Sequence, residues 1–144
     1  MTTDQALAIV AAARAKAREL KCALAYAVVD DGGNVLAMVR DEAAAFLRSA
    51  IALNKAWGCI AMGIPSRTLR DHAEGWENWF TGISGASGGR LVPTLGGVIV
   101  RDAAGAIVGA FGTSGGIPGD IDEACAVHGV TAAGFTADVG EKKK

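Results

Sequence analysis

The chain has 144 residues, of which 51% are hydrophobic and 20% charged, and its formal net charge is −1. This length is typical of one domain, so we expect residues 1–144 to form a single domain with a flexible C-terminal tail from about residue 136. The near-neutral charge argues against nucleic acid or an anionic membrane surface as a partner.

The distribution of apolar and charged residues bears on location and assembly. No apolar run approaches the roughly 20 residues of a membrane-spanning helix, and charged residues within positions 1–20 leave no signal-peptide core. We therefore expect a cytoplasmic protein. The 20 glycines and the large apolar fraction predict surface that is covered in a homo-oligomer or in a ligand pocket. The three cysteines are far apart, which argues against a disulfide framework or a zinc site.

The first half of the chain predicts two helices around a hairpin. Apolar residues at helical spacing predict a first helix that ends near Lys21. Residues 25–40 predict a β-hairpin, because two apolar strands flank an acidic and glycine-rich turn at 31–34. A second helix is expected over about 46–62, and Gly63-Ile64-Pro65 ends it, since proline cannot continue a helix.

The second half predicts short helices, a loop, another hairpin and a last helix. Ser66 is expected to cap a short helix, and about 74–83 forms a further helical or irregular segment. Residues 82–97 are expected to be a loop that is mobile or functional. A second hairpin follows, and the last helix runs from about residue 120 to 129. The order α-β-β-α-α-β-β-α predicts an α+β fold, in which helices flank an antiparallel sheet built from two hairpins.

Several ordered motifs carry a resemblance to a known family. They are Ala27-Val28-Val29-Asp30-x-Gly32-Gly33 with Arg40, Ala52-x-x-Lys55-Ala56, Gly96-Gly97, Gly109-Ala110-x-Gly112-x-Ser114-Gly115-Gly116-x-Pro118 and Asp122-Glu123-x-Cys125-Ala126. With these motifs the chain resembles the GlcG/HbpS family, also called haem-binding or haem-degrading, and the C-terminal domain of PduO-type proteins. The resemblance covers roughly residues 5–134.

The resemblance implies a profilin-like or PAS-like sheet, assembly as a homo-oligomer (dimer, tetramer or octamer) and binding of a small-molecule ligand, with haem as the candidate cofactor. The segment between the second helix and the second hairpin departs from the family pattern, because it carries His72, Trp76, Trp79 and Phe80. Val98-Ile99 also stands where a proline is common in the family. A changed pocket wall predicts a changed ligand.

Two side chains are candidates for catalysis or ligation. His72 is interpreted as a general base, a haem iron ligand or a surface residue. His128, late in the last helix, is interpreted as structural. Lys55 lies among apolar neighbours, so it is either a partly desolvated acid, base or anion clamp, or a lysine that pairs with Asp30 or another carboxylate.

Aromatic side chains form a third candidate group. They are Trp57, Trp76, Trp79, Phe80 and Phe111. Two interpretations are open: they belong to the core or a subunit contact, or they line a flat pocket for a planar ligand. The second interpretation requires residues 70–80 to fold back over the sheet and wall a cavity there.

A run of small residues precedes the last helix. Gly112, Thr113 and Ser114, followed by two more glycines, resemble a cradle in which backbone N–H groups bind an anion; close packing of the backbone is the alternative. The acids at the start of that helix are interpreted as first-turn residues favoured by the helix dipole, and they are Asp120, Asp122 and Glu123.

Three functions are consistent with these residues. The first is a small-molecule-binding protein with haem or another planar ligand in a tryptophan-lined pocket, where His72 is the metal ligand. The second is a cofactor-independent enzyme, an isomerase, lyase or hydrolase acting on a small organic metabolite of a catabolic pathway, in which His72 and Lys55 transfer protons. The third is an oligomeric structural subunit without a ligand. The family resemblance favours the first.

Overall fold

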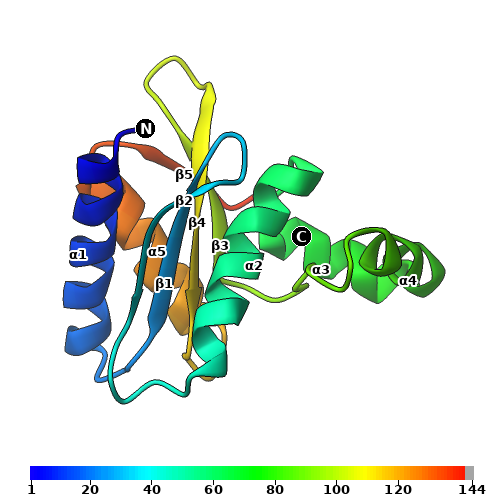
Figure 1. Ribbon diagram of the computed structural model, residues 1–144, viewed down its shortest axis with the longest axis horizontal. Coiled ribbons are helices and arrows are strands. Elements are labelled where there is room, and N and C mark those ends of the chain that lie inside the picture. Colours follow the sequence, from blue (N-terminus) through cyan, green and yellow to red (C-terminus); the bar gives the residue numbers. More distant parts are fainter. Residues whose placement is uncertain (142–144) are drawn as a thin grey trace.

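The computed structural model describes residues 1–141 and confirms the expected α+β architecture with an antiparallel sheet (Figure 1). The elements are α1 (Thr3–Glu19), β1 (Ala25–Asp30), β2 (Val35–Arg40), α2 (Leu47–Met62), α3 (Ser66–Gly75), α4 (Glu77–Ala86), β3 (Gly97–Arg101), β4 (Ile107–Ser114), α5 (Asp120–Ala132) and β5 (Thr136–Asp138). The expected order of helices and hairpins is present, with one more helix and one more strand.

The sheet joins the two predicted hairpins side by side. Its strand order is β2-β1-β4-β3-β5, and every neighbouring pair is antiparallel. An aspartate closes each hairpin in the same way. Asp30 Oδ1 accepts hydrogen bonds of 2.9 Å from the amides of Gly32 and Asn34. Asp102 Oδ1 accepts the equivalent bonds from two amides of its own turn, also at 2.9 Å. These side-chain bonds add to the two backbone hydrogen bonds that each turn also makes, and together they fix the point where the chain reverses.

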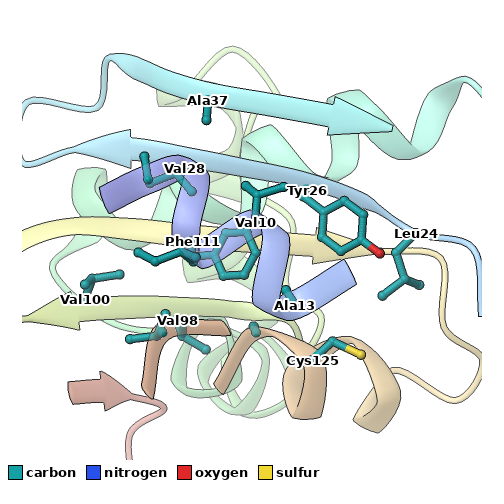
Figure 2. Close-up of a cluster of buried hydrophobic side chains, with 14 of the residues drawn as sticks. Val10, Ala13, Leu24, Tyr26, Val28, Ala37, Val98, Val100, Phe111 and Cys125 are labelled. Carbon is teal, nitrogen blue, oxygen red and sulfur yellow. The ribbon is translucent and has the colours of Figure 1, made fainter. Parts of the chain in front are cut away.

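Helices cover both faces of the sheet. Figure 1 shows α1 and α5 on one face and α2 on the other. Because successive strand residues point to opposite faces, Tyr26 and Val28 pack toward α1 and α5, while Val29 packs toward α2. Tyr26 and Phe111 are fully buried, and their rings stack with centroids 6.5 Å apart in the larger cluster, which Figure 2 shows. The main core therefore lies between the sheet and the α1–α5 pair.

The face toward α2 is lined by small residues, which lets this helix lie unusually close to the sheet. Ala25, Ala27 and Ala52 form a buried cluster there. A Cβ atom at Gly112 of β4 would lie 2.0 Å from the carbonyl oxygen of Ala52, so only glycine fits at that position. The close contact places the next turn of α2, which carries Lys55, beside the end of β4.

Two expectations from the sequence are corrected. Residues 82–97 are not all loop, because α4 continues to Ala86 before the chain becomes irregular. The predicted flexible tail from about residue 136 begins instead with β5, which pairs with β3. The Arg101 side chain holds this strand through an ion pair of 2.8 Å with Asp138. The last part of the expected tail, 142–144, lies outside the described residues.

Asp41, directly after β2, ties α1 to the sheet. Its carboxylate accepts hydrogen bonds from Arg14 Nε (2.9 Å), the Tyr26 hydroxyl (2.9 Å) and the Leu24 amide (3.1 Å). Burial by itself raises the pKa of Asp41, but these three donors outweigh it and hold that pKa below its usual range. The ionised carboxylate is therefore the form that the fold stabilises.

We predict that Asp41→Asn lowers the free energy of unfolding by about 2 kcal/mol at pH 7, because it removes charge-assisted hydrogen bonds. Since the folded-state pKa is depressed, the loss is complete above the ordinary aspartate pKa of about 4. It shrinks as the pH falls through the folded-state pKa, where the wild-type carboxyl is also neutral. Urea unfolding at several pH values measures this, with the exposed Asp31→Asn as the control. If the stability lost in Asp41→Asn stayed constant at acid pH, the ionised Asp41 carboxylate would not be the form that the fold stabilises.

Candidate functional site

A buried ion pair joins α2 to α5 at the end of the sheet. Lys55 Nζ donates to Asp122 Oδ2 and to the carbonyl oxygen of Thr113, both at 2.9 Å. Both charged side chains are only 3% exposed. The second carboxylate oxygen, Asp122 Oδ1, accepts the Gly116 amide at 2.7 Å. One of the two interpretations of Lys55 from the sequence is that it pairs with Asp30 or another carboxylate. The structure shows such a pair, and the partner is Asp122 rather than Asp30.

Gly96 makes room for this ion pair. It has a φ of 110°, and an added Cβ would lie 2.7 Å from Asp122 Cβ and 3.1 Å from Lys55 Nζ. Any residue larger than glycine at position 96 would push the Lys55 ammonium and the Asp122 carboxylate apart. The space that the pair occupies therefore explains Gly96, whereas Gly97 makes room for the Lys55 carbonyl and the Ser66 side chain, which would lie 2.9 and 3.0 Å from an added Cβ.

Burial and charge act on Lys55 in opposite directions. Desolvation lowers the pKa of the ammonium group, and Asp122 partly restores it. The positive charge of Arg48 lowers the pKa of Lys55 further. The ammonium proton is therefore held less tightly than on a lysine in water.

A cavity of about 290 Å³ opens beside the pair, and we call it the Lys55 cavity. Arg48, Lys55 and Asp122 supply its charges, while Ile51 and Leu95 are among its apolar walls. Arg48 is half-buried and forms no ion pair with any of residues 1–141. The cavity therefore combines a neutralised ion pair with one further cation.

Ser114 contributes a hydroxyl to the same cavity. Its residue is fully buried, and within the described chain its Oγ has no hydrogen-bond partner. Since β4 places Ala110 and Gly112 against α2, the period of two also turns Ser114 to that face. Buried hydroxyls are normally paired, so this one is available to a bound molecule.

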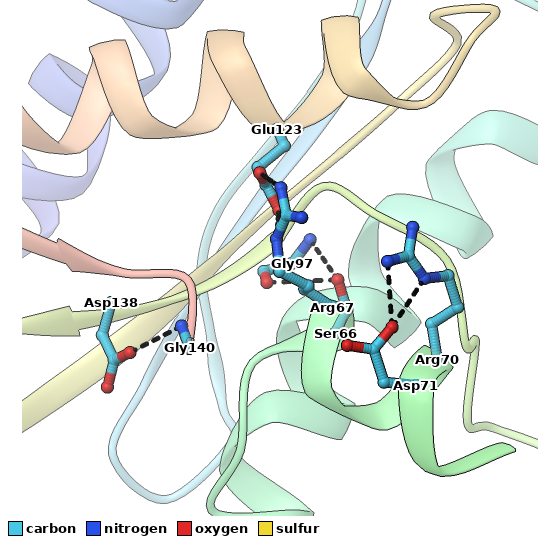
Figure 3. A network of polar contacts seen from close by, with 8 residues as sticks. All are labelled: Ser66, Arg67, Arg70, Asp71, Gly97, Glu123, Asp138 and Gly140. Atoms are coloured by element: carbon cyan, nitrogen blue, oxygen red, sulfur yellow. Dashed lines mark hydrogen bonds and ion pairs between the residues drawn. The ribbon is translucent and has the colours of Figure 1, made fainter. Parts of the chain in front are cut away.

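Polar contacts fix α3 against the body of the protein (Figure 3). Ser66 Oγ accepts the Gly97 amide at 2.8 Å and donates to the Gly97 carbonyl at 3.1 Å. The Arg67 guanidinium pairs with the Glu123 carboxylate on α5 through two hydrogen bonds. Helix α3 is thereby held between β3 and α5, next to the Lys55–Asp122 pair.

An aromatic cluster lies farther along α3 and on α4, and we call His72, Trp76 and Trp79 the aromatic arm. The ring centroid of His72 lies 4.9 Å from Trp76 and 5.5 Å from Trp79, and the two indoles are 6.0 Å apart. Trp76 is 59% exposed. An open hollow of about 460 Å³ adjoins both indoles and the acidic side chains of Glu74 and Glu77.

The arm does not fold back over the sheet as expected. Among residues 1–141, α4 contacts no element except α3, and none of its residues is buried. Figure 1 shows α4 projecting away from the sheet beyond α3. The aromatic arm therefore forms no wall of the Lys55 cavity.

The other aromatic candidates lie in different places. Phe111 belongs to the main core, and Phe80 is half-buried on α4. Trp57 lies on α2, where the Arg90 guanidinium stacks 3.8 Å above its ring. The five aromatic residues therefore do not share one pocket. His72 is also absent from the lining of the Lys55 cavity, so the structure does not bring together the two proposed proton-transfer residues.

The sequence identifies Lys55 and Ser114 as candidates but not the two other charged residues of the cavity, Arg48 and Asp122. From the sequence, Asp122 is interpreted as a first-turn acid of the last helix, and Arg48 is not among the candidates. The spacing gave a signal for Asp122, because an aspartate that follows a glycine-rich turn by a few residues can reach back to the free amides of that turn. Arg48 carried no comparable signal, since its role depends on how α2 meets the loop before β3.

Two kinds of feature are absent from residues 1–141. No helix there combines the length and hydropathy that crossing a bilayer demands. In the same range, no group of three or more His, Cys, Asp or Glu side chains has an arrangement that could hold a metal ion.

The sequence comparison identifies the family. The sequence model of the family described as haem degrading protein HbpS-like matches residues 1–131. The chain therefore belongs to the HbpS-like family, as its motifs indicated. None of the curated proteins compared with it matches.

Solved structures show the same fold. The structure of a PduOC:heme complex is 23% identical with a TM-score of 0.86, and the match covers 96% of this chain and 98% of that chain. Protein ORFY from Klebsiella pneumoniae is 27% identical with a TM-score of 0.84, covering 92% and 90%. A double mutant of HbpS from Streptomyces reticuli is 26% identical with a TM-score of 0.80, covering 93% and 87%.

We predict that Ser114→Ala raises the free energy of unfolding by up to about 1 kcal/mol, because it removes a buried hydroxyl without a partner. The matched control is Ser66→Ala, which removes a hydroxyl with two hydrogen bonds and lowers stability by about 1 kcal/mol or more. Urea unfolding of both variants measures the contrast. Equal destabilisation by the two substitutions would show that the Ser114 hydroxyl has a structural partner.

Proposed function

We propose that this protein binds a small molecule and that haem is its ligand. Membership of a family described as haem degrading supports this proposal. So does the likeness of its fold to a protein solved as a heme complex. The observation that carries the proposal within this chain is the contact of the His72 imidazole with the indoles of Trp76 and Trp79.

The donor set of the aromatic arm fits haem. An imidazole is a common axial ligand of haem iron, and indole rings offer flat apolar faces to a macrocycle. The Lys55 cavity fits less well, because no histidine, cysteine or methionine lines it and its volume of about 290 Å³ is too small to enclose a porphyrin. We therefore assign haem to the arm.

Within this assignment, His72 would ligate the iron and the exposed indole of Trp76 would offer its face to the macrocycle. The Trp79 ring stands at 80° to that of Trp76, so it would meet the macrocycle with its edge. Bound haem would supply the redox chemistry of its iron. His72 is half-buried, so its imidazole is not sealed inside the core, and the open hollow beside the arm is lined by the two indoles that it contacts.

We also propose that the protein is a homo-oligomer. Helix α4 has no buried residue, and Trp76 is largely exposed at the start of this helix. Exposed apolar surface of this kind is typical of protein contacts. A second copy would enclose a ligand that one copy leaves open to solvent.

The two histidines of the chain allow a matched test of the haem proposal. His128 is exposed on α5, in a groove that it shares with Lys16 and Arg67. No aromatic residue lines that groove. His128→Ala therefore removes an accessible imidazole without touching the aromatic arm.

We predict that hemin added to the purified protein produces a shifted Soret band. His72→Ala should weaken binding at least about tenfold, which corresponds to about 1.4 kcal/mol, because the iron loses its axial ligand. His128→Ala should bind like the wild type, and circular dichroism checks that both variants are folded. The proposal fails if the wild type gives no shift. The assignment to His72 fails if the two variants bind hemin equally.

A further inference from the structure

We propose that the Lys55 cavity is a separate binding site for a short-chain organic monocarboxylate. Nothing in the haem proposal uses this cavity. Three independent features of its lining point to the same class of ligand: the charge, the free hydroxyl and the combination of size with apolar walls.

The charge of the cavity favours a single negative charge on the ligand. Lys55 and Asp122 neutralise each other at 2.9 Å, and the second oxygen of Asp122 already accepts the Gly116 amide. Arg48 is the remaining charge in the lining, and it has no carboxylate partner among residues 1–141. A guanidinium binds a carboxylate through two parallel hydrogen bonds. One unpaired guanidinium therefore matches one carboxylate.

The Ser114 hydroxyl supplies the second polar contact. It is buried without a partner, and leaving such a group unpaired costs about 1–3 kcal/mol. A ligand oxygen in the cavity would accept a hydrogen bond from this hydroxyl and recover this energy. Proteins commonly keep an unfavourable buried group where a ligand satisfies it.

The size and walls of the cavity restrict the rest of the ligand. Its volume of about 290 Å³ is at the lower end for ligand sites. Ile51, Val92 and Leu95 offer apolar surface to a short hydrocarbon chain. The start of α5 also borders the cavity at Gly119, where the helix dipole adds positive potential to that of Arg48. A small carboxylate with a short apolar chain satisfies all of these groups.

The charge and the apolar walls of the Lys55 cavity also disfavour inorganic phosphate as its ligand. An inorganic phosphate dianion would bring two charges to one available cation and would leave the apolar walls without a partner. We therefore expect the site to prefer butyrate to phosphate. This preference separates the proposal from nonspecific binding of anions to a positively charged surface.

The test is a titration of isotope-labelled, haem-free protein with sodium butyrate and, separately, with sodium phosphate, at constant ionic strength. NMR follows the backbone amides of Ser114, Gly116 and Gly119. Butyrate should shift these amides in a saturable way, and phosphate should not. Arg48→Gln should weaken butyrate binding about tenfold and Ser114→Ala about fivefold, within the range measured for single polar contacts. Arg18→Gln, an exposed arginine on α1, should bind like the wild type.

The outcomes decide the proposal independently of haem. It is overturned if butyrate leaves these amides unchanged, if phosphate shifts them equally, or if Arg48→Gln binds butyrate like the wild type. The titration uses no haem and its readout is not the Soret band. Failure of the monocarboxylate site and failure of the haem proposal are therefore distinguishable.

Discussion

The arrangement of this protein around its cavity depends on one buried ion pair. Lys55 on α2 and Asp122 on α5 belong to helices on opposite faces of the sheet, and they meet at its end, where Thr113 and Gly116 complete their hydrogen bonds. Both charges are removed from water, so neither can be tolerated without the other. Helix α2, β4 and the start of α5 are consequently held in one geometry, and the cavity is the space that this geometry leaves open.

The same constraint explains why the molecule presents two different regions for ligands. The backbone and side chains around the ion pair are close-packed, because glycines at positions 96 and 112 leave room for the groups beside them. Ser66 and Arg67 fix α3 against this region. Beyond α3 the packing ends, and the aromatic arm projects from the body. The enclosed region suits a small charged molecule held by specific polar contacts. The projecting arm suits a large flat molecule or a second copy of the chain.

Local patterns predicted the hairpins, the helices and several site residues. Apolar runs on either side of turns that contain aspartate and glycine define β1–β2 and β3–β4, and the period of two places Ser114 beside α2. What the sequence could not predict depends on tertiary packing. The partner of Lys55 lies 67 positions away, and helical spacing of Trp76 and Trp79 indicates a shared face without indicating what it covers. Strand β5 has only three residues, so its pairing with β3 is determined by the sheet edge rather than by its own sequence.

The central claim is that Lys55 and Asp122 stabilise the fold as a coupled pair, and a double-mutant cycle tests it most directly. The free energy of unfolding is measured for the wild type, Lys55→Met, Asp122→Asn and the double variant. Each single substitution leaves the partner's buried charge unpaired and should lower the free energy of unfolding by about 3–5 kcal/mol. The double variant should lose about 2 kcal/mol less than the sum of the two. Losses that add within about 0.5 kcal/mol would contradict the account.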